Sequence, residues 1–454
     1  MGAPGMQIED RLARFATTNI LDDHARRIMR LSIFDWTVCA LAGQTEPVAK
    51  ILLRKGRFEG GLEQATVIGG TKLPAARAAL INGAISHALD YDDTHFDHIG
   101  HTSVAVVPAA LATAQAQGRT MAEFVDAALI GSEAAVRVGT WLGRDHYQVG
   151  FHQTATSGAF GAALASLRLM DAPRDRIVAG LGLATTRAAG LKSQFGTMGK
   201  PLNAGLAAEA GVEAALWAVA GLTSADHGLG GPLGFGATHH GHANAAALDG
   251  LGDEWRMKSV SYKYHACCHG LHAMLEALGS LQLDPAKVAQ VQIATHPRWM
   301  SVCNKPAPQT GLEAKFSYAQ TAAMTLAGVD TGAIQSFSDD IATHSVLTVL
   351  RQRVQVVEDD TLTEMQARVV VTMADGGERQ AFQDLAAPVP VQELESKLRH
   401  KGRALVGADH ADRLWGAVNG DSLSAYVDLL GAPDLIDRSE SIDIARQTLD
   451  GFMS

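Results

Sequence analysis

The chain of 454 residues is sparing with cysteine, aromatic residues and charge. Its four cysteines, Cys39, Cys267, Cys268 and Cys303, show no CxxC spacing, which excludes a zinc ribbon and favours a reducing compartment. The net charge of −10, without any cluster of Lys and Arg, argues against nucleic acid or an anionic membrane surface as a partner. Charged residues interrupt every long apolar run, and no signal peptide is evident. We therefore predict no membrane span and a cytoplasmic location.

What the chain does contain is apolar helix-forming sequence. Hydrophobic residues make up 47%, and Ala and Leu recur at helical spacing from the start to about residue 225. The clearest predicted helices are Asp10–Leu41, Met121–Leu142, Thr156–Met170, Asp175–Leu191 and Leu202–Ala220. Two later runs, Val288–Thr295 and Ala367–Met373, are rich in β-branched residues and predict strands.

These patterns predict a mainly α protein. We expect an all-helical domain over 1–261 and a smaller α+β domain over 262–395 that includes a helix at Tyr318–Ala327. The segment 396–454 returns to helix, with runs at Glu393–His400 and Ala411–Leu430. We expect it to pack back on the helical domain, which makes that domain discontinuous. Residues 226–242 form a loop rich in Gly and His.

The most informative stretch is Asp90 to His101, which holds four carboxylates and three imidazoles within twelve residues. Apolar helical sequence flanks it on both sides, so the charged groups fill a loop between two buried helices. Like charges so close together are costly unless they are solvated, bound to a metal, or used to shift one another's proton affinity. The stretch is therefore a candidate site.

Two further ionisable residues stand at predicted helix starts. Lys200 precedes Pro201, which belongs in the first turn of a helix, and His152 precedes hydroxyl residues suited to capping the next helix. The positive end of the helix dipole disfavours the charged form of Lys200, while free N–H groups nearby can hold a carboxylate. Each residue alone is more often an ordinary lysine or histidine, but together they resemble one wall of a pocket.

A second cluster runs from Ser261 to His272. His269 and His272 are three residues apart on one helical face, and Lys263 stands at the entry. Metal binding by Cys268, His269 and His272 stays open, although partners at the required spacing are missing. The acidic loop also lacks a complete set of ligands, so we predict no metal and no cofactor.

Several motifs in this order resemble the MmgE/PrpD family over residues 10–400. They are Asn82-Gly83-xxx-His87-Ala-Leu-Asp90-Tyr-Asp92-Asp93-Thr94, His101-Thr-Ser103, Gly196-Thr197-xx-Lys200-Pro201-Leu202 and Lys263-xxxx-Cys268-xxx-His272. The family contains 2-methylcitrate dehydratase, cis-aconitate decarboxylase and iminodisuccinate epimerase, none of which needs a metal. The resemblance implies a large helical domain with a smaller α+β domain, and a homodimer.

The resemblance also implies a site for a small di- or tricarboxylate. The matched family positions are Asp90, Thr94, His101, His152, Lys200 and Lys263. The reactions alter bonding at a carbon next to a carboxylate, which requires positive charge near that carboxylate and a group that moves a proton. We assign catalysis to Lys200, His101, His152 and Asp90. Substrate binding falls to Lys263, Thr94, His272 and Gln320.

Two departures from the family bear on the reaction. His101-Thr102-Ser103 replaces the usual His-Pro-Ser, and Gln320 falls where the dehydratases and decarboxylases commonly have a tyrosine. Because epimerisation has no leaving group to protonate, these departures favour an epimerase of an iminodisuccinate-like substrate by two-base proton transfer. A dehydratase or decarboxylase is the alternative. A non-catalytic carboxylate-binding protein is more distant.

Overall fold

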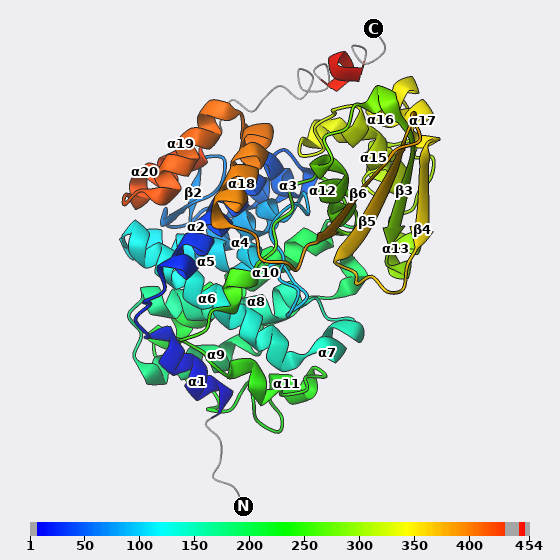
Figure 1. Ribbon diagram of the computed structural model, residues 1–454. Coiled ribbons are helices and arrows are strands. Elements are labelled where there is room, and N and C mark those ends of the chain that lie inside the picture. The colour runs from blue at the N-terminus through cyan, green and yellow to red at the C-terminus, as the bar shows by residue number, and fades with distance from the viewer. Residues whose placement is uncertain (1–6, 432–444, 450–454) are drawn as a thin grey trace, which may run out of the picture. The chain divides into compact units, whose positions relative to one another are not determined.

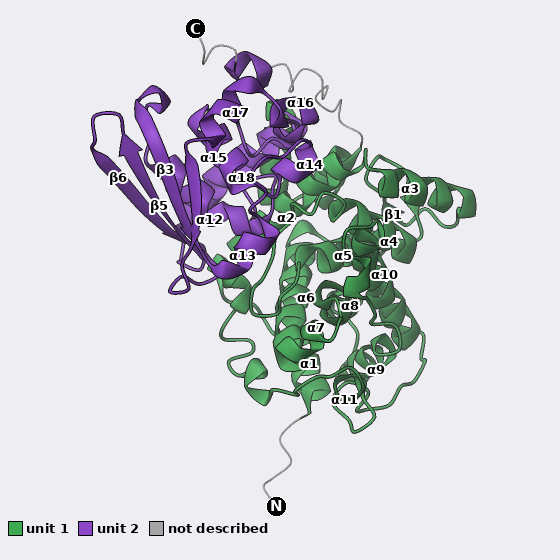
Figure 2. Ribbon diagram, turned by 90° about the vertical axis from the view of Figure 1, so that its right-hand side faces the viewer, with its two compact units in different colours: residues 1–262, 408–434 green, residues 263–407, 435–454 purple. Residues whose placement is uncertain are grey.

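The computed structural model describes residues 7–431 and 445–449 (Figure 1). The chain divides into two compact units, which Figure 2 shows in different colours. Unit 1 comprises residues 1–262 and 408–434, and unit 2 comprises residues 263–407 and 435–454. Helix α18 (Val391–Val406) is thereby grouped with unit 2, and α19 (Ala408–Asn419) and α20 (Leu423–Val427) with unit 1. Of the C-terminal segment 396–454, residues 432–444 and 450–454 lie outside the described residues.

Unit 1 is built almost entirely of helices. They are α1 (Ile8–Ala16), α2 (Asp23–Gly43), α3 (Pro47–Glu59), α4 (Ala75–Ser86), α5 (Ser103–Ala116), α6 (Met121–Leu142), α7 (Arg144–Gln148), α8 (Gln153–Leu169), α9 (Arg174–Ala184), α10 (Gly199–Val219), α11 (Phe235–Thr238), α19 (Ala408–Asn419) and α20 (Leu423–Val427). Two short strands, β1 (Ala65–Thr66) and β2 (Lys72–Leu73), form an antiparallel pair.

The centre of unit 1 is a cluster of five helices, α4, α5, α6, α8 and α10, which pack on one another. Their sequences are Ala-rich and apolar on nearly all sides, the pattern of helices surrounded by protein. Small residues let two of them approach closely, because a Cβ on Gly83 of α4 would lie 2.9 Å from the Cα of Gly205 in α10. This crossing lies four residues before His87 and five after Lys200, so it brings the end of α4 to the start of α10.

A buried ion pair fixes a long loop to α6. The Arg137 Nε atom donates to Glu133 at 2.6 Å, and both side chains are fully buried. Arg137 also donates to the carbonyl oxygens of three loop residues, Ala247, Asp249 and Glu254. Glu133 accepts the backbone N–H groups of residues 256 and 257 at 3.1 and 2.8 Å. Residues 245–259 contain two short 3-10 helices, at Ala245–Leu248 and Arg256–Ser259. The pair supplies side-chain hydrogen bonds to backbone groups of this loop.

Unit 2 contains a four-stranded mixed sheet in the order β4-β3-β5-β6. Its strands are β3 (Val288–Thr295), β4 (Val354–Glu358), β5 (Gln366–Met373) and β6 (Glu378–Asp384), and only the β3–β4 pair is parallel. Helix α12 (His272–Ser280) packs on β5 and β6, and α15 (Tyr318–Leu326) packs on β4 (Figure 2). The remaining helices are α13 (Pro297–Val302), α14 (Gly311–Ala314), α16 (Asp339–Ala342), α17 (Ser345–Arg351) and α18 (Val391–Val406).

The mainly α character with a small mixed sheet confirms the coarser part of the predicted fold class, a mainly α protein with some β structure. Two of the predicted helices were wrong in extent. The first, Asp10–Leu41, is two helices. The chain leaves the helix after Ala16, and Asp22 starts α2 by accepting the backbone N–H of Ala25 at 2.9 Å. Helix α9 also ends earlier than predicted, at Ala184, and the predicted Gly/His-rich loop contains the one-turn helix α11.

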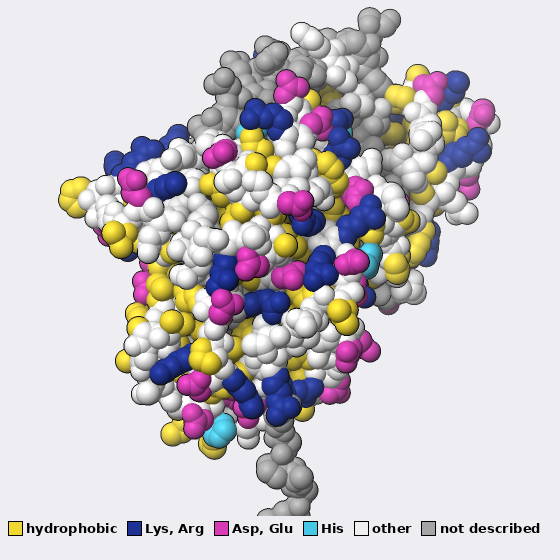
Figure 3. All heavy atoms as spheres, turned by 90° about the vertical axis from the view of Figure 1, so that its left-hand side faces the viewer, with side chains coloured by type: hydrophobic (Ala, Val, Ile, Leu, Met, Phe, Trp, Pro, Cys, Tyr) yellow, Lys and Arg dark blue, Asp and Glu magenta, His cyan; other side chains and the backbone are white. Residues whose placement is uncertain are grey.

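The distribution of surface charge and the length of the helices are relevant to binding of nucleic acid or membranes. Basic and acidic side chains are interspersed over the face shown in Figure 3, without a broad area of a single sign. Among the described residues, helices of the length and hydropathy that a bilayer crossing demands do not occur.

Candidate active site

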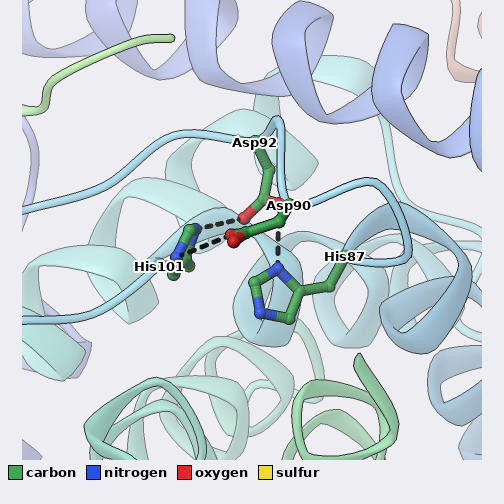
Figure 4. A group of neighbouring side chains, drawn as sticks. All are labelled: His87, Asp90, Asp92 and His101. Carbon is green, nitrogen blue, oxygen red and sulfur yellow. Dashed lines mark hydrogen bonds and ion pairs between the residues drawn. The ribbon is translucent and has the colours of Figure 1, made fainter. Parts of the chain in front are cut away.

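The predicted acidic loop connects α4 to α5 in unit 1 and brings some of its ionisable groups together. Asp90, Asp92 and His101 converge, and His87 at the end of α4 joins them (Figure 4). Each of the four residues offers an atom that lies within 4.8 Å of the others' atoms. The loop therefore forms one compact cluster of two imidazoles and two carboxylates.

Asp92 lies between the two histidines of this cluster. Its Oδ1 atom is 2.9 Å from Nδ1 of His87, and its Oδ2 atom is 2.7 Å from Nδ1 of His101. Burial by itself would raise the pKa of Asp92, but the adjacent His101 and His87 hold that pKa well below its usual range. Asp92 is therefore a buried, ionised carboxylate with an imidazole on each side.

Asp90 occupies the solvent side of the cluster. Its φ angle is +51°, in the left-handed region that aspartate tolerates better than most residues, and its side chain is 51% exposed. Its Oδ1 atom is 2.8 Å from Nζ of Lys200 and 3.4 Å from Nε2 of His101. The cluster thus ends in an ion pair between a half-exposed carboxylate and a partly exposed ammonium group.

His152 lies beside the cluster as a neutral ring. It precedes α8, its ring centroid is 6.1 Å from that of His87, and Phe195 packs edge-on against it. Burial, followed by the charges of His87 and Lys200, lowers the pKa of His152 to about 2. Asn203 donates to its Nδ1 atom at 3.2 Å and to the carbonyl oxygen of Leu191. Its proton is therefore on Nε2.

Two of the three histidines in the predicted stretch have structural roles. His95 is buried, with Nε2 2.8 Å from the carbonyl oxygen of Arg256, and His98 is buried beside Thr102, whose Oγ1 atom is 3.2 Å from its Nε2. Burial lowers the pKa of His95, and it lowers that of His98 well below the usual range. Both rings are neutral and pack the loop against its surroundings.

Neither catalysis nor substrate binding was assigned from the sequence to His87, Asp92 or Asn203, although Asp92 lies in the predicted stretch. His87 ends an apolar helix directly before the acidic loop, a position that could have singled it out. The role of Asn203 depends on the fold of residues 190–203 and has no such signal.

The remaining predicted residues lie elsewhere. Thr94 is half-buried and pairs through its backbone with Ser261 at 2.8 Å. In unit 2, Lys263 and His272 are buried, and burial followed by His269 and His265 lowers the pKa of His272 well below its usual range. Substrate binding by Thr94, Lys263 and His272 therefore stays a prediction.

Gln320, also in unit 2, is fully buried and accepts a hydrogen bond from Nη1 of Arg351 at 2.9 Å. Its amide is thus held inside the unit. Its part in substrate binding also stays a prediction.

The side chains of the cluster are of the kinds that bind metal ions. In the described part of the chain, one group has the spacing that a metal site requires, namely His87, Asp90, Asp92 and His101. The alternative site at Cys268, His269 and His272 does not have this spacing. Linear spacing did not reveal this group. However, these side chains already contact one another, as His87 does Asp92, and the ammonium group of Lys200 is the cation that pairs with Asp90. The cluster is therefore an acid–base network held by ion pairs and by the hydrogen bond between His87 and Asp92.

Asp93 points away from the cluster. It accepts both the backbone N–H and the hydroxyl of Ser103, at 3.1 and 2.5 Å, and so fastens the loop to the start of α5. Burial, with the nearby charges of Asp35 and Asp92, raises the pKa of Asp93 to about 7. The folded protein therefore holds a proton there between about pH 4 and 7, where the unfolded chain has lost it.

We predict that Asp93→Asn stabilises the protein at pH 8 but not at pH 4. A raised carboxyl pKa lowers the free energy of unfolding as pH rises towards 7, and asparagine removes that loss. The expected gain at pH 8 exceeds about 1 kcal/mol, measured by urea unfolding. Asp97→Asn, at an exposed position of the same loop, is the control. Equal effects of Asp93→Asn at both pH values would contradict the prediction.

Comparisons with known proteins identify the family. A model of the MmgE/PrpD N-terminal domain matches residues 10–247, and one of the MmgE/PrpD C-terminal domain matches residues 265–419. The chain belongs to the MmgE/PrpD family, as the motifs predicted.

Among its relatives, a cis-aconitate decarboxylase of Aspergillus terreus is 27% identical over 437 residues, which cover 87% of this chain and 88% of that protein. A cis-aconitate decarboxylase-like protein of Aspergillus oryzae is 26% identical over 394 residues, covering 77% and 80%. The human cis-aconitate decarboxylase is 24% identical over 424 residues, 87% of each chain. These relatives support an enzyme. They favour the predicted lyase alternative over the epimerase, for which they give no support.

Proposed function

We propose that this protein is a decarboxylase of a small unsaturated tricarboxylate of the cis-aconitate type. The similarity to cis-aconitate decarboxylases over most of the chain favours this reaction. The observation that carries the chemistry is the position of His101, whose Nδ1 atom lies 2.7 Å from the buried Asp92 and whose Nε2 atom faces Asp90. A carboxylate on one side of an imidazole stabilises its protonated form, and the other nitrogen can then donate a proton.

The reaction requires one proton for each carbon dioxide released. In cis-aconitate, a CH2–carboxylate group is attached to a carbon–carbon double bond. When the bond to that carboxylate breaks, its electron pair forms a new double bond, and the electrons of the old double bond take a proton at the far carbon. The trianion and one proton become a dianion and carbon dioxide. We assign this proton to Nε2 of His101, which solvent then reprotonates.

The other groups bind and orient the substrate. Lys200, at the start of α10, offers positive charge to a substrate carboxylate while Asp90 holds its ammonium group in place. His152, neutral with its proton on Nε2, donates a hydrogen bond. Gln320 need not replace a proton-donating tyrosine, because His101 performs that step. Lys263 as a second carboxylate ligand, and a homodimer, stay predictions from the family resemblance.

The test is to incubate the pure protein with cis-aconitate in deuterium oxide. We expect release of carbon dioxide and a product with an undeuterated terminal methylene group. One deuterium per molecule should be bound to the far carbon of the former double bond, as detected by proton NMR. Dialysis against a chelator beforehand is expected to leave the rate unchanged, because the cluster serves as an acid–base network. A lasting loss of activity that a divalent metal restores would contradict the metal-free mechanism.

Other products distinguish the alternatives. Incorporation of deuterium into an amino dicarboxylate without loss of carbon dioxide would identify the epimerase. Gain or loss of water would identify the dehydratase. Binding of tricarboxylates without any reaction would leave a non-catalytic carboxylate-binding protein.

A further inference from the structure

His87 is the member of the cluster that has no role in the proposed reaction. It lies at the end of α4, next to the close crossing with α10, and its side chain is fully buried. Its Nδ1 atom is 2.9 Å from Oδ1 of Asp92, as Figure 4 shows. Its Nε2 atom is also buried and has no hydrogen-bond partner within residues 7–431 and 445–449.

This asymmetry determines where the protons lie. Nδ1 of His87 faces a carboxylate oxygen, so it carries a hydrogen and donates a hydrogen bond to Asp92. Protonating Nε2 as well would bury an N–H group without an acceptor, at a cost of roughly 1–3 kcal/mol or more. The Nε2 atom of His101, in contrast, faces Asp90 at 3.4 Å. Of the two rings that flank Asp92, His101 is therefore the one suited to carry a second proton.

We propose that His87 is a positioning residue that sets, through Asp92, how readily His101 gives up its proton. This proposal rests on the proposed function in one respect, namely that His101 is the proton donor. By donating to Oδ1, His87 fixes the plane of the carboxylate and withdraws part of its negative charge from Oδ2. His101 is then held less tightly protonated than it would be beside a carboxylate that accepted from His101 alone.

The direction of the effect follows from the groups around His101. They are Asp90, Asp92, His87, His98, His152 and Lys200. Removing the donor at Nδ1 of His87 leaves the other groups in place and strengthens the pull of Asp92 on the proton of His101. The protonation midpoint of His101 should rise, and His101 should become a weaker acid.

Two matched variants test this. In His87→Asn the amide nitrogen can take the place of Nδ1 and still donate to Asp92, whereas in His87→Gln it takes the place of Nε2. The first readout is the protonation midpoint of His101, measured without substrate by nitrogen NMR of histidine-labelled protein. His101→Gln identifies the signal. The second is kcat and KM with cis-aconitate across pH.

We expect the midpoint of His101 to rise by about half a pH unit or more in His87→Gln and to stay near that of the parent in His87→Asn. We expect kcat to fall about tenfold or more in His87→Gln with little change in KM, while His87→Asn keeps most of the parent's kcat. An unchanged midpoint in His87→Gln, or equal impairment of the two variants, would overturn the proposal.

If His87→Gln does not fold by circular dichroism, His87→Leu, which also lacks the donor, takes its place with the same expected shift. The NMR readout needs no reaction, so it separates the two hypotheses. A parent protein that releases no carbon dioxide from cis-aconitate contradicts the proposed function but leaves the role of His87 to be decided by the midpoint of His101.

Discussion

Replacing His101 by Gln is expected to lower the rate of carbon dioxide release by about 10²–10⁴-fold, the range that a general acid contributes. Glutamine occupies similar space but has no proton to give at this acidity, so the far carbon of the double bond stays unprotonated. Binding should change little, because Lys200 and Asp90 still form the ion pair that we propose binds the substrate carboxylate. The measurement is kcat and KM from product formation, with binding checked by calorimetry.

The matched control is His242→Gln. His242 is more than half exposed and pairs with Asp145 at 2.8 Å in unit 1, apart from the cluster, so the rate should equal that of the parent. If His101→Gln kept most of its turnover, another group would have to supply the proton, and His152 with its proton on Nε2 would be the next candidate.

The largest effect on stability is expected from Arg137→Met. This change leaves the carboxylate of Glu133 buried without its partner and frees three backbone carbonyl oxygens of the loop. Breaking a buried pair by removing one member costs about 3–5 kcal/mol. The free energy of unfolding, measured in urea, should fall by that amount.

A double variant is the control for this interpretation. Adding Glu133→Gln to Arg137→Met removes the buried charge while keeping an acceptor for residues 256 and 257, so part of the stability should return. Since residues 245–259 lead to Ser261, which pairs with Thr94, the single variant should also lose activity before it unfolds. Additive losses in the double variant would show that the two side chains do not act as a pair.

The sequence predicted those features of the fold that depend on local periodicity. The strand Val288–Thr295 and the helix Met121–Leu142 have the predicted bounds. The reason is that runs of β-branched or Ala-rich sequence favour strand or helix locally, without help from distant residues. The strands β4 and β6 were not predicted. β6, at an edge of the sheet, reads Glu-Arg-Gln-Ala-Phe-Gln-Asp, a mostly polar sequence that only pairing with β5 makes extended.

The candidate site was predictable where its residues share a loop and hidden where tertiary structure assembles it. Asp90 and His101 stood out because charge was concentrated in one short stretch. That Asp92 is buried between two imidazoles, while Asp93 turns to Ser103, depends on side-chain directions that spacing does not reveal. Lys200 was chosen for a place at a helix start, yet its contact with Asp90 comes from the crossing of α4 and α10.

That crossing limits how this scaffold can evolve. A single methyl group at Gly83 or Gly205 would meet backbone atoms of the other helix within 3 Å, so the two helices would have to separate. The separation would be transmitted to Lys200 and His87, each about one turn from the crossing, and would disturb the spacing of the charged groups. New substrates are therefore more easily gained by changing loops around the cluster than by repacking the helices that carry it.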